Sequence, residues 1–411
     1  MGKNVAKGKI PYKEFSFVHP PIQIYILAFL FKLFGTSLLV AKILPLISSS
    51  LVVLLIYLIS KELYNQRIAI LSSLFFLITP TFLAFSDQGY GMWESLLFFL
   101  LSIYLLIKNK IQVSALSYII GVFVRYLTII YFPFILILIF LKNRKNLKKF
   151  SLYFVLIFSI FFFSFYVIFG YNFINQTILF QIVSKTMTTH LQKLTSQYLS
   201  IGFFTIFLAT ISTFVAFEKK HNLTFLFSIY PILADLVILF TFKTIAYHYF
   251  LFSVPLVIIA TSKVFMFSKD AIVKIFLLIV IVLSIVCNFQ TIEFYWNPTY
   301  SKNIHYISKY VMNAISKGDN IFGESSIVDY ISFTTGIPIT SNYLDSYIAY
   351  LEYIDEKKVI QNLEKEKPKF IIDMENYYIS NLYFRSYLQE KYTLKLRVEG
   401  IPNYFIYERK V

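Results

Sequence analysis

Charged residues, glycine, proline and cysteine are all scarce in this sequence. Only 15% of the 411 residues are charged, whereas an ordinary soluble domain has about a quarter. Glycine and proline number 12 each, beside 46 Phe and 32 Tyr, which excludes collagen-like, linker-like and disordered chains. The single cysteine, Cys287, excludes an intramolecular disulfide framework and a cysteine-based zinc site. Because 57% of the residues are hydrophobic and the mean hydropathy is +0.67, most of the chain is expected to lie in lipid.

Long apolar runs recur from Ile43 to Phe289. A membrane span needs about 20 mostly apolar residues, because a helix of that length crosses the hydrocarbon while satisfying its own backbone hydrogen bonds. The run 111–141 forms either one long tilted helix or two short helices broken near Arg125. With the broken form, the sequence predicts about ten transmembrane helices, at roughly 39–60, 68–86, 92–107, 112–124, 127–141, 150–169, 199–217, 222–241, 245–263 and 271–290.

The net charge of +16 reflects basic residues that cluster at the ends of these runs. If the chain crosses ten times, all the clusters fall on one side, which the positive-inside rule identifies as cytoplasmic. We therefore expect no nucleic-acid partner. Residues 1–20, the segment around Asp87, the 170–198 loop and everything after Asn288 are then predicted to share the extracytoplasmic face of the plasma membrane. The clusters are Lys61 with Arg67, Lys108 with Lys110, the run 142–149, Lys219 with Lys220, and Lys263 with Lys269 and Lys274.

Polar residues return after position 291, and no later run is long enough to span a membrane. We divide the chain into an external loop and juxtamembrane segment (1–37), a helical bundle (38–290) and a small extracytoplasmic α/β domain (291–411). In this last domain, periodicity predicts helices near 302–316, 356–365 and 381–391, and strands near 319–323, 369–373, 393–398 and 403–408.

Ionisable groups in or beside membrane spans are costly, so each is a candidate functional residue. Asp87 and Glu94 bracket a short outer loop, where they could bind a sugar, a cation or a cationic partner; the alternative is a solvated loop carboxylate. Arg125 lies at the outer turn between two predicted helices, where a guanidinium can clamp phosphate oxygens. Its alternative role is to snorkel to the interface. Asp235 lies in mid-span, where an interhelical bond and an active role are both open.

Two further groups of polar residues fall on the predicted outer face. In the 170–198 loop, Lys185, His190 and Lys193 have spacings that could share a helix face. The triplet Tyr247-His248-Tyr249 begins a span and places an imidazole beside two phenols, although interfacial aromatic belts also explain the tyrosines.

The most specific string is GKIPYKEFSFVHPP at residues 8–21. Its two final prolines end any helix there and fix an extended backbone, which holds His19 rigidly at the interface. A purely structural turn would need neither His19 nor Glu14.

Here the chain resembles the membrane-embedded glycosyltransferases of the GT-C fold, especially the protein O-mannosyltransferase and aminoarabinose transferase group, which use lipid-phosphate sugars. The first external loop of that family closes with a His-Pro-Pro or Lys-Pro-Pro motif preceded by an acidic residue. The resemblance extends over nearly the whole chain, through Glu14, His19-Pro20-Pro21, Ile22–Gly35, Ala41–Tyr64, Glu94, Gly121–Tyr126 and Tyr247-His248-Tyr249.

The sequence departs from the family at one important place. The family carries its catalytic acidic residue, usually in an Asp-Glu pair, in the same loop ahead of the Pro-Pro motif and after a first transmembrane helix. This sequence begins 18 residues before His19. A start assigned too late, a loss of activity, or a transfer of the role to Glu14 would each explain the difference; we favour a start assigned too late.

The resemblance implies an inverting hexosyl or pentosyl transfer from a polyprenyl-phosphate donor to a protein, glycan or lipid acceptor. A carboxylate among Glu14, Asp87 and Glu94 would be the general base. His19, Arg125, Lys185, His190, Tyr247 and His248 would hold the lipid phosphate and stabilise its charge as it leaves. The resemblance implies no cofactor, and whether a divalent metal assists stays open.

Two other functions remain open on the sequence alone. A transporter or lipid flippase would show inverted repeats and broken helices at mid-membrane, whereas the candidate polar groups gather at one face. A catalytically inactive membrane scaffold would fit the missing acidic pair.

Overall fold

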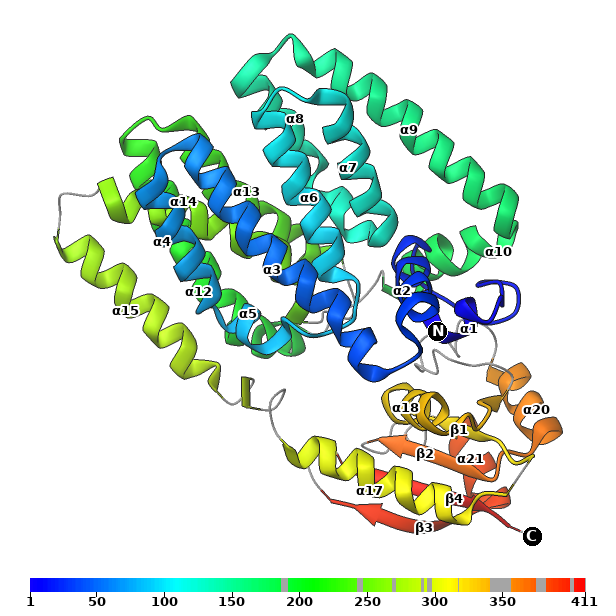
Figure 1. Cartoon of the computed structure of the whole chain (residues 1–411). Coiled ribbons are helices and arrows are strands. Elements are labelled where there is room, and N and C mark those ends of the chain that lie inside the picture. The colour runs from blue at the N-terminus through cyan, green and yellow to red at the C-terminus, as the bar shows by residue number, and fades with distance from the viewer. Residues whose placement is uncertain are drawn as a thin grey trace.

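The computed structural model describes residues 1–185, 191–241, 247–267, 271–289, 292–293, 298–316, 318–340, 356–374, 382–399 and 403–410. Figure 1 shows a bundle of helices with a small α/β domain at one end, beside the short helix α1 (Gly2–Ala6) and the apolar helix α2 (Ile22–Phe34). The predicted fold class, a helical membrane bundle followed by an α/β domain, is confirmed.

Each predicted span corresponds to a helix or to a pair of consecutive helices. By length and composition, five described helical stretches suffice to cross a membrane: 38–63, 126–143, 146–169, 222–241 and 248–266. The bundle elements are α3 (Leu38–Leu63), α4 (Gln66–Leu77), α5 (Pro80–Phe85), α6 (Met92–Ile107), α7 (Ile111–Val124), η1 (Tyr126–Tyr131), α8 (Phe132–Asn143), α9 (Asn146–Phe169), α12 (Leu191–Glu218), α13 (Asn222–Thr241), η3 (Tyr247–Phe252), α14 (Ser253–Phe267) and α15 (Ala271–Cys287).

The predicted break near Arg125 is present. Arg125 has an extended backbone (φ −147°, ψ 120°), which ends α7 and starts the 3₁₀ helix η1. Helices α6 and α7 pack closely here, because a Cβ on Gly121 would lie 3.1 Å from the carbonyl oxygen of Ser95. The hydroxyl of Ser95 lies 2.7 Å from the carbonyl oxygen of Gly121 and 2.5 Å from the hydroxyl of Thr128, which fixes the turn from inside the bundle.

The basic loops meet at one end of the bundle. Lys108, after α6, pairs with Glu62, near the end of α3, at 2.7 Å. The Tyr64 hydroxyl after α3 lies 3.0 Å from that of Thr224 in α13, and the ammonium of Lys263 in α14 lies 4.9 Å from the Tyr64 ring centroid. We call this the basic end; Figure 1 places α1, α2 and the α/β domain at the opposite end.

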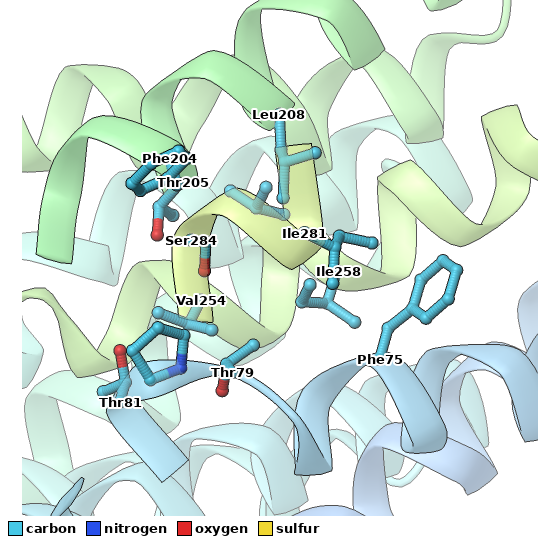
Figure 2. Close-up of a pocket in the computed structure, with 12 residues that line it drawn as sticks. Phe75, Thr79, Thr81, Phe204, Thr205, Leu208, Val254, Ile258, Ile281 and Ser284 are labelled. Carbon is cyan, nitrogen blue, oxygen red and sulfur yellow. The ribbon is translucent and has the colours of Figure 1, made fainter. Parts of the chain in front are cut away.

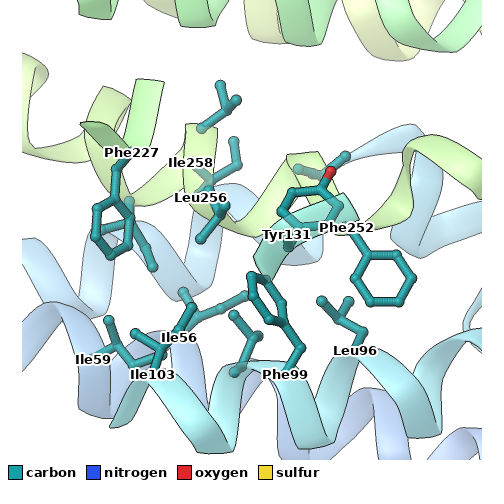
Figure 3. Close-up of a cluster of buried hydrophobic side chains, with 14 of the residues drawn as sticks. Ile56, Ile59, Leu96, Phe99, Ile103, Tyr131, Phe227, Phe252, Leu256 and Ile258 are labelled. Atoms are coloured by element: carbon teal, nitrogen blue, oxygen red, sulfur yellow. The ribbon is translucent and has the colours of Figure 1, made fainter. Parts of the chain in front are cut away.

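Aromatic side chains fill the centre of the bundle. Phe99 of α6, Tyr131 of η1 and Phe252 of η3 are each fully buried, with ring centroids 5.1 Å apart for Phe99 and Tyr131 and 5.6 Å apart for Tyr131 and Phe252. Figure 3 shows these three rings next to one another, beside the helix that carries Leu96 and Ile103. Such aromatic pairs lock neighbouring elements beyond what area burial alone provides.

The C-terminal domain has a four-stranded sheet of order β1-β2-β4-β3. Strands β1 and β2 are parallel and the other two pairs are antiparallel. Every predicted strand and helix of this domain is present, and α18 was not predicted. The elements are α17 (Pro298–Ala314), β1 (Ile321–Gly323), α18 (Ser325–Thr335), α20 (Glu356–Glu366), β2 (Phe370–Met374), α21 (Leu382–Lys391), β3 (Tyr392–Val398) and β4 (Tyr404–Arg409).

Two local features stabilise this domain. Gly323 has φ +143°, and a Cβ there would lie 2.1 Å from the carbonyl oxygen of Ile372, so only glycine allows β1 to approach β2. The N–H of Ser316 donates to the carboxylate of Asp319 at 2.7 Å, and Lys369 pairs with the same oxygen at 3.2 Å. These two contacts, the N–H first, lower the pKa of Asp319.

The domain packs against the start of the chain. The ammonium of Lys3 in α1 donates to the carbonyl oxygen of Phe333 in α18 at 2.7 Å. The ring of Phe31 in α2 lies 5.8 Å from that of Phe333. Residues 1–31, which include the string 8–21, therefore lie with the C-terminal domain at the end of the bundle opposite the basic loops.

Candidate active site

The external loop that ends in His-Pro-Pro is built around Tyr12. Tyr12 has φ +66° and is buried against the rings of Phe169 and Phe173, at 5.0 and 5.6 Å. Burial raises the pKa of its phenol well above the usual range, so the hydroxyl remains a donor. That hydroxyl donates to the carbonyl oxygen of His19 at 2.6 Å and closes the loop. The half-buried His19 imidazole packs edge-on to Phe17 at 5.9 Å.

Two glutamines bind the backbone of this loop from outside it. The side-chain amide of Gln176 accepts from the N–H of Phe17 and donates to the carbonyl of Tyr12, both at 3.0 Å. Gln181 donates to the carbonyl of Val18 at 2.8 Å. Both belong to the segment expected to be an external loop, which is helical from 171 to 185 as α10 (Tyr171–Ile174), the π-helix η2 (Asn175–Leu179) and α11 (Phe180–Lys185).

Glu14 lies on the outer side of the same loop. Its exposed carboxylate accepts from the N–H of Ile10 at 2.5 Å and stabilises the loop's own turn. The neighbouring Lys13 donates to the carbonyl of Ile168 near the end of α9 at 2.7 Å. The partial negative charge at a helix C-terminus favours a cation in this position. Both charged side chains therefore already have partners within the loop and its supporting helix.

A second loop, 86–91, lies between α5 and α6 and is held from several sides. The hydroxyl of Ser49 in α3 donates to the carbonyl of Ser86 at 3.1 Å. Gln23, in the first turn of α2, donates to the carbonyl of Gly89 at 3.2 Å. Lys42 pairs with Asp87 at 2.6 Å, with both side chains substantially exposed. The loop thus joins α2 and α3 at the end of the bundle that carries His19.

Arg125 and His248 both pack against this loop. Gly91, at φ +76°, leaves little room for a side chain, because a Cβ there would lie 3.1 Å from Gln23 Cγ and 3.2 Å from Arg125 Nε. The ring of His248 stacks on that of Tyr90 at 4.8 Å with an interplanar angle of 17°. Two cationic or titratable groups from separate elements therefore reach adjacent residues of one loop.

Glu94 lies just behind the loop, in the first turn of α6, where the partial positive charge of the helix N-terminus favours a carboxylate. Its side chain is 2% exposed, and neither carboxylate oxygen has a hydrogen-bond partner among the described residues. Among the described residues, Arg125 is the cation whose charge acts on Glu94. A buried carboxylate without a hydrogen bond is costly, and such sites are more typical of function than of packing.

The remaining predicted site residues lie at the edge of the described structure. His190 lies outside the described residues. Lys185 ends α11 and Tyr247 begins η3, but the side chains of both lie outside the described part.

Asp235 of α13 accepts a hydrogen bond from Ser253, which favours the interhelical bond over an active role. No group of three His, Cys, Asp or Glu side chains suited to a metal ion is present among the described residues.

A cavity lies deeper in the bundle, where α4 gives way to α5 at Thr79 and Pro80. Figure 2 shows it enclosed by Phe75, Phe204 and Ile258, among others, from α4, α12 and α14, with α15 on the remaining side. Its described lining is apolar or hydroxyl-bearing. This lining offers no charged or amide group to a phosphate.

Comparison with solved structures decides the architecture. ArnT from Cupriavidus metallidurans in the apo state superposes with a TM-score of 0.63 at 11% identity, over 98% of this chain and 91% of ArnT. The chain has the GT-C fold. Residues 18–169 of this GT-C chain match the family model described as dolichyl-phosphate-mannose-protein mannosyltransferase. The expected resemblance is confirmed.

Two further structures extend the comparison. ArnT bound to undecaprenyl phosphate matches with a TM-score of 0.61 at 9% identity and the same coverage. The archaeal oligosaccharyltransferase AglB from Archaeoglobus fulgidus, in complex with an inhibitory peptide and a dolichol-phosphate, matches with a TM-score of 0.55 at 13% identity, over all of this chain and 69% of AglB. No curated protein sequence matches the chain.

Sequence reasoning missed the uncharged residues that position the site. Gln23, Gln176 and Ser49 carry no charge, and only their place beside the two loops gives them a role. A weak signal was available for Gln23, a polar residue two positions after Pro21 in the apolar first turns of α2.

Proposed function

We propose that this GT-C chain is a glycosyltransferase that moves a sugar from a polyprenyl-phosphate donor to an acceptor hydroxyl at the end of the bundle that carries His19. The convergence of Arg125 and His248 on adjacent residues of the loop 86–91 is the observation that carries the proposal. The shared fold with ArnT and the family match over 18–169 support it. In this proposal that end of the bundle is extracytoplasmic, since the basic loops lie at the other end.

The lipid phosphate binds between the two loops. Arg125 presents a planar guanidinium suited to two phosphate oxygens, and His248 and His19 supply imidazole donors from either side. Lys185, His190 and Tyr247 are further donors in the proposed site. These groups stabilise the negative charge that grows on the phosphate as it leaves, while the lipid chain lies among the apolar helices.

Asp87 is the carboxylate that we assign as general base. It lies in the loop that Arg125 and His248 contact, and its exposed side chain can reach a hydroxyl arriving from water. The buried Glu94 lies behind the loop and acts on Arg125 through its charge alone, since neither of its oxygens has a hydrogen-bond partner among the described residues. Glu14, engaged with the N–H of Ile10 on the outer side of its loop, keeps the loop shape.

The reaction is a single displacement at the anomeric carbon. The acceptor oxygen attacks and its proton passes to Asp87, while the bond between the anomeric carbon and the phosphate oxygen breaks. Polyprenyl phosphate leaves with that electron pair, and the configuration at the anomeric carbon inverts. The acceptor is a protein, glycan or lipid hydroxyl, which the C-terminal domain positions.

Transfer assays test this proposal directly. The full chain in lipid nanodiscs receives polyprenyl-phosphate donors carrying radiolabelled hexoses or pentoses, together with peptide, glycan and lipid acceptors. We expect transfer by the parent and a loss of at least about tenfold in Arg125→Gln and Asp87→Asn. The matched control is Arg67→Gln, which removes an exposed arginine at the basic end and should leave transfer unchanged.

A different result would contradict the proposal. If no donor and acceptor pair gives transfer, and vesicles containing the chain instead move the labelled donor between leaflets, the chain is a lipid transporter. Transfer that is equally fast in Arg125→Gln and Arg67→Gln would show that the phosphate binds elsewhere.

A further inference from the structure

The two residues that we propose to bind the phosphate are presented by matching local structures. Arg125 directly precedes the 3₁₀ helix η1, and His248 is the second residue of the 3₁₀ helix η3. Each 3₁₀ helix continues directly into an α-helix with a proline in its first turn, Pro133 in α8 and Pro255 in α14. Proline is preorganised for that position and marks where each α-helix begins.

The equivalent residues of these two junctions bond to each other. Tyr131 and Ser253 each lie two positions before their proline, and their hydroxyl oxygens are 2.7 Å apart. Ser253 also donates to the carboxylate of Asp235 in α13. All three side chains are essentially inaccessible to solvent. One chain of hydrogen bonds thus connects η1, the start of α14 and α13.

Neighbouring contacts make this connection specific for register. The hydroxyl of Tyr230 in α13 donates to the carbonyl of Ile130 in η1 at 2.6 Å. The rings of Tyr131 and Phe252, both labelled in Figure 3, stack with their centroids 5.6 Å apart. Apolar packing alone tolerates small slides of one helix on another, whereas hydrogen bonds in a core of low dielectric constant are directional and costly to break.

The separation of Arg125 and His248 depends on this register. They contact Gly91 and Tyr90, whose Cα atoms are about 3.8 Å apart as consecutive residues. A shift of η1 against η3 by a fraction of that distance would move one of the two groups away from a shared phosphate.

We propose that Tyr131, Ser253 and Asp235 form a positioning tie that fixes the spacing between Arg125 and His248. These three residues touch neither donor nor acceptor; they act through the two 3₁₀ helices. The inference rests on the proposed function, because the spacing matters only if both groups hold one phosphate.

Kinetics distinguish a positioning role from a merely structural one. In Ser253→Ala and Tyr131→Phe, we expect the KM for the polyprenyl-phosphate donor to rise about fivefold or more at a nearly unchanged KM for the acceptor. Ser253→Thr, which keeps a hydroxyl, should restore most of the donor KM. Ser212→Ala is the matched control: it removes one member of another buried hydroxyl pair, with Thr261 at 3.0 Å.

Cross-linking provides a readout that does not depend on activity. Arg125→Cys and His248→Cys are combined in a Cys287→Ser background and treated with a short bifunctional thiol reagent. We expect efficient cross-linking that falls severalfold when Ser253→Ala is added and does not change when Ser212→Ala is added.

The outcomes separate the two proposals. If the parent shows no transfer, the proposed function fails, and the cross-linking yields still decide whether the tie sets the spacing. If Ser253→Ala lowers turnover at an unchanged donor KM, or cross-links as well as its parent, the positioning tie is refuted. A Ser253→Ala protein that does not fold is replaced by Tyr131→Phe, to which the same criteria apply.

Discussion

Gln176→Ala removes the clamp on the His-Pro-Pro loop and should loosen that loop without unfolding the bundle. Two hydrogen bonds to backbone groups are lost, at Phe17 and Tyr12. At about 1 kcal/mol net for each bond, the free energy of local opening falls by about 2 kcal/mol. Because about 1.4 kcal/mol corresponds to a factor of ten, opening becomes about 30-fold more frequent.

Hydrogen exchange measured by mass spectrometry on peptides covering residues 8–21 checks this value. Amide exchange in the loop should accelerate by about 30-fold in Gln176→Ala, and the donor KM should rise with it. Gln176→Glu should show an intermediate effect, since its carboxylate still accepts from Phe17 but cannot donate to Tyr12. Gln112→Ala is the control, because Gln112 bonds Tyr153 far from the loop. Unchanged exchange in folded Gln176→Ala would refute the clamp.

Three other perturbations test separate parts of the structure. Gly91→Ala should impair transfer and lower the free energy of unfolding by about 1–3 kcal/mol. The control Gly35→Ala, at a similar φ of +82° with nothing within 4 Å, should lower stability without affecting transfer. Equal transfer defects in the two variants would contradict the contact between Gly91 and Arg125. Gly323→Ala should disrupt the pairing of β1 with β2 and lower the free energy of unfolding by more than about 4 kcal/mol. The loss should be far larger than in Gly318→Ala, where the added Cβ meets open space. Equal thermal unfolding temperatures for the two variants would contradict this. The pKa of Asp319 is lowered in the folded protein, so its ionised carboxylate stabilises the fold above about pH 4, and this contribution is lost as the pH falls through the folded pKa. The thermal unfolding temperatures of Asp319→Asn and its parent should therefore differ at pH 7 and converge on acidification. A difference that stays constant with pH would contradict the assignment.

The sequence predicted the elements of this fold well because hydrophobic length and periodicity are local signals. The break at Arg125 was predicted because two short helices, unlike one long tilted helix, keep all the basic loops on one side of the membrane. Helix α18 escaped prediction because its sequence, rich in Ile, Val, Thr and aromatic residues, has weak helix propensity. Burial of Ile327, Val328 and Ile331 decides its conformation, and burial depends on the rest of the domain.

The candidate site was predictable as a set of ionisable residues at one end, but not as a geometry. Nothing local in the sequence shows that Arg125 packs on Gly91 or that His248 stacks on Tyr90, since these contacts join elements far apart in the chain. The glutamine clamp is equally non-local, because Gln176 bonds residues more than 150 positions away. A single sequence supplies the participants of such contacts and not their pairing.

The 3₁₀ helices also solve a problem of length. A 3₁₀ helix rises about 2.0 Å per residue and an α-helix about 1.5 Å. The twelve residues of α8 alone reach about 18 Å, well short of a bilayer core of about 30 Å. The six residues of η1 add about 12 Å and bring the pair to that thickness. The stretch that follows Arg125 thus brings a short helix to the length that a membrane span needs.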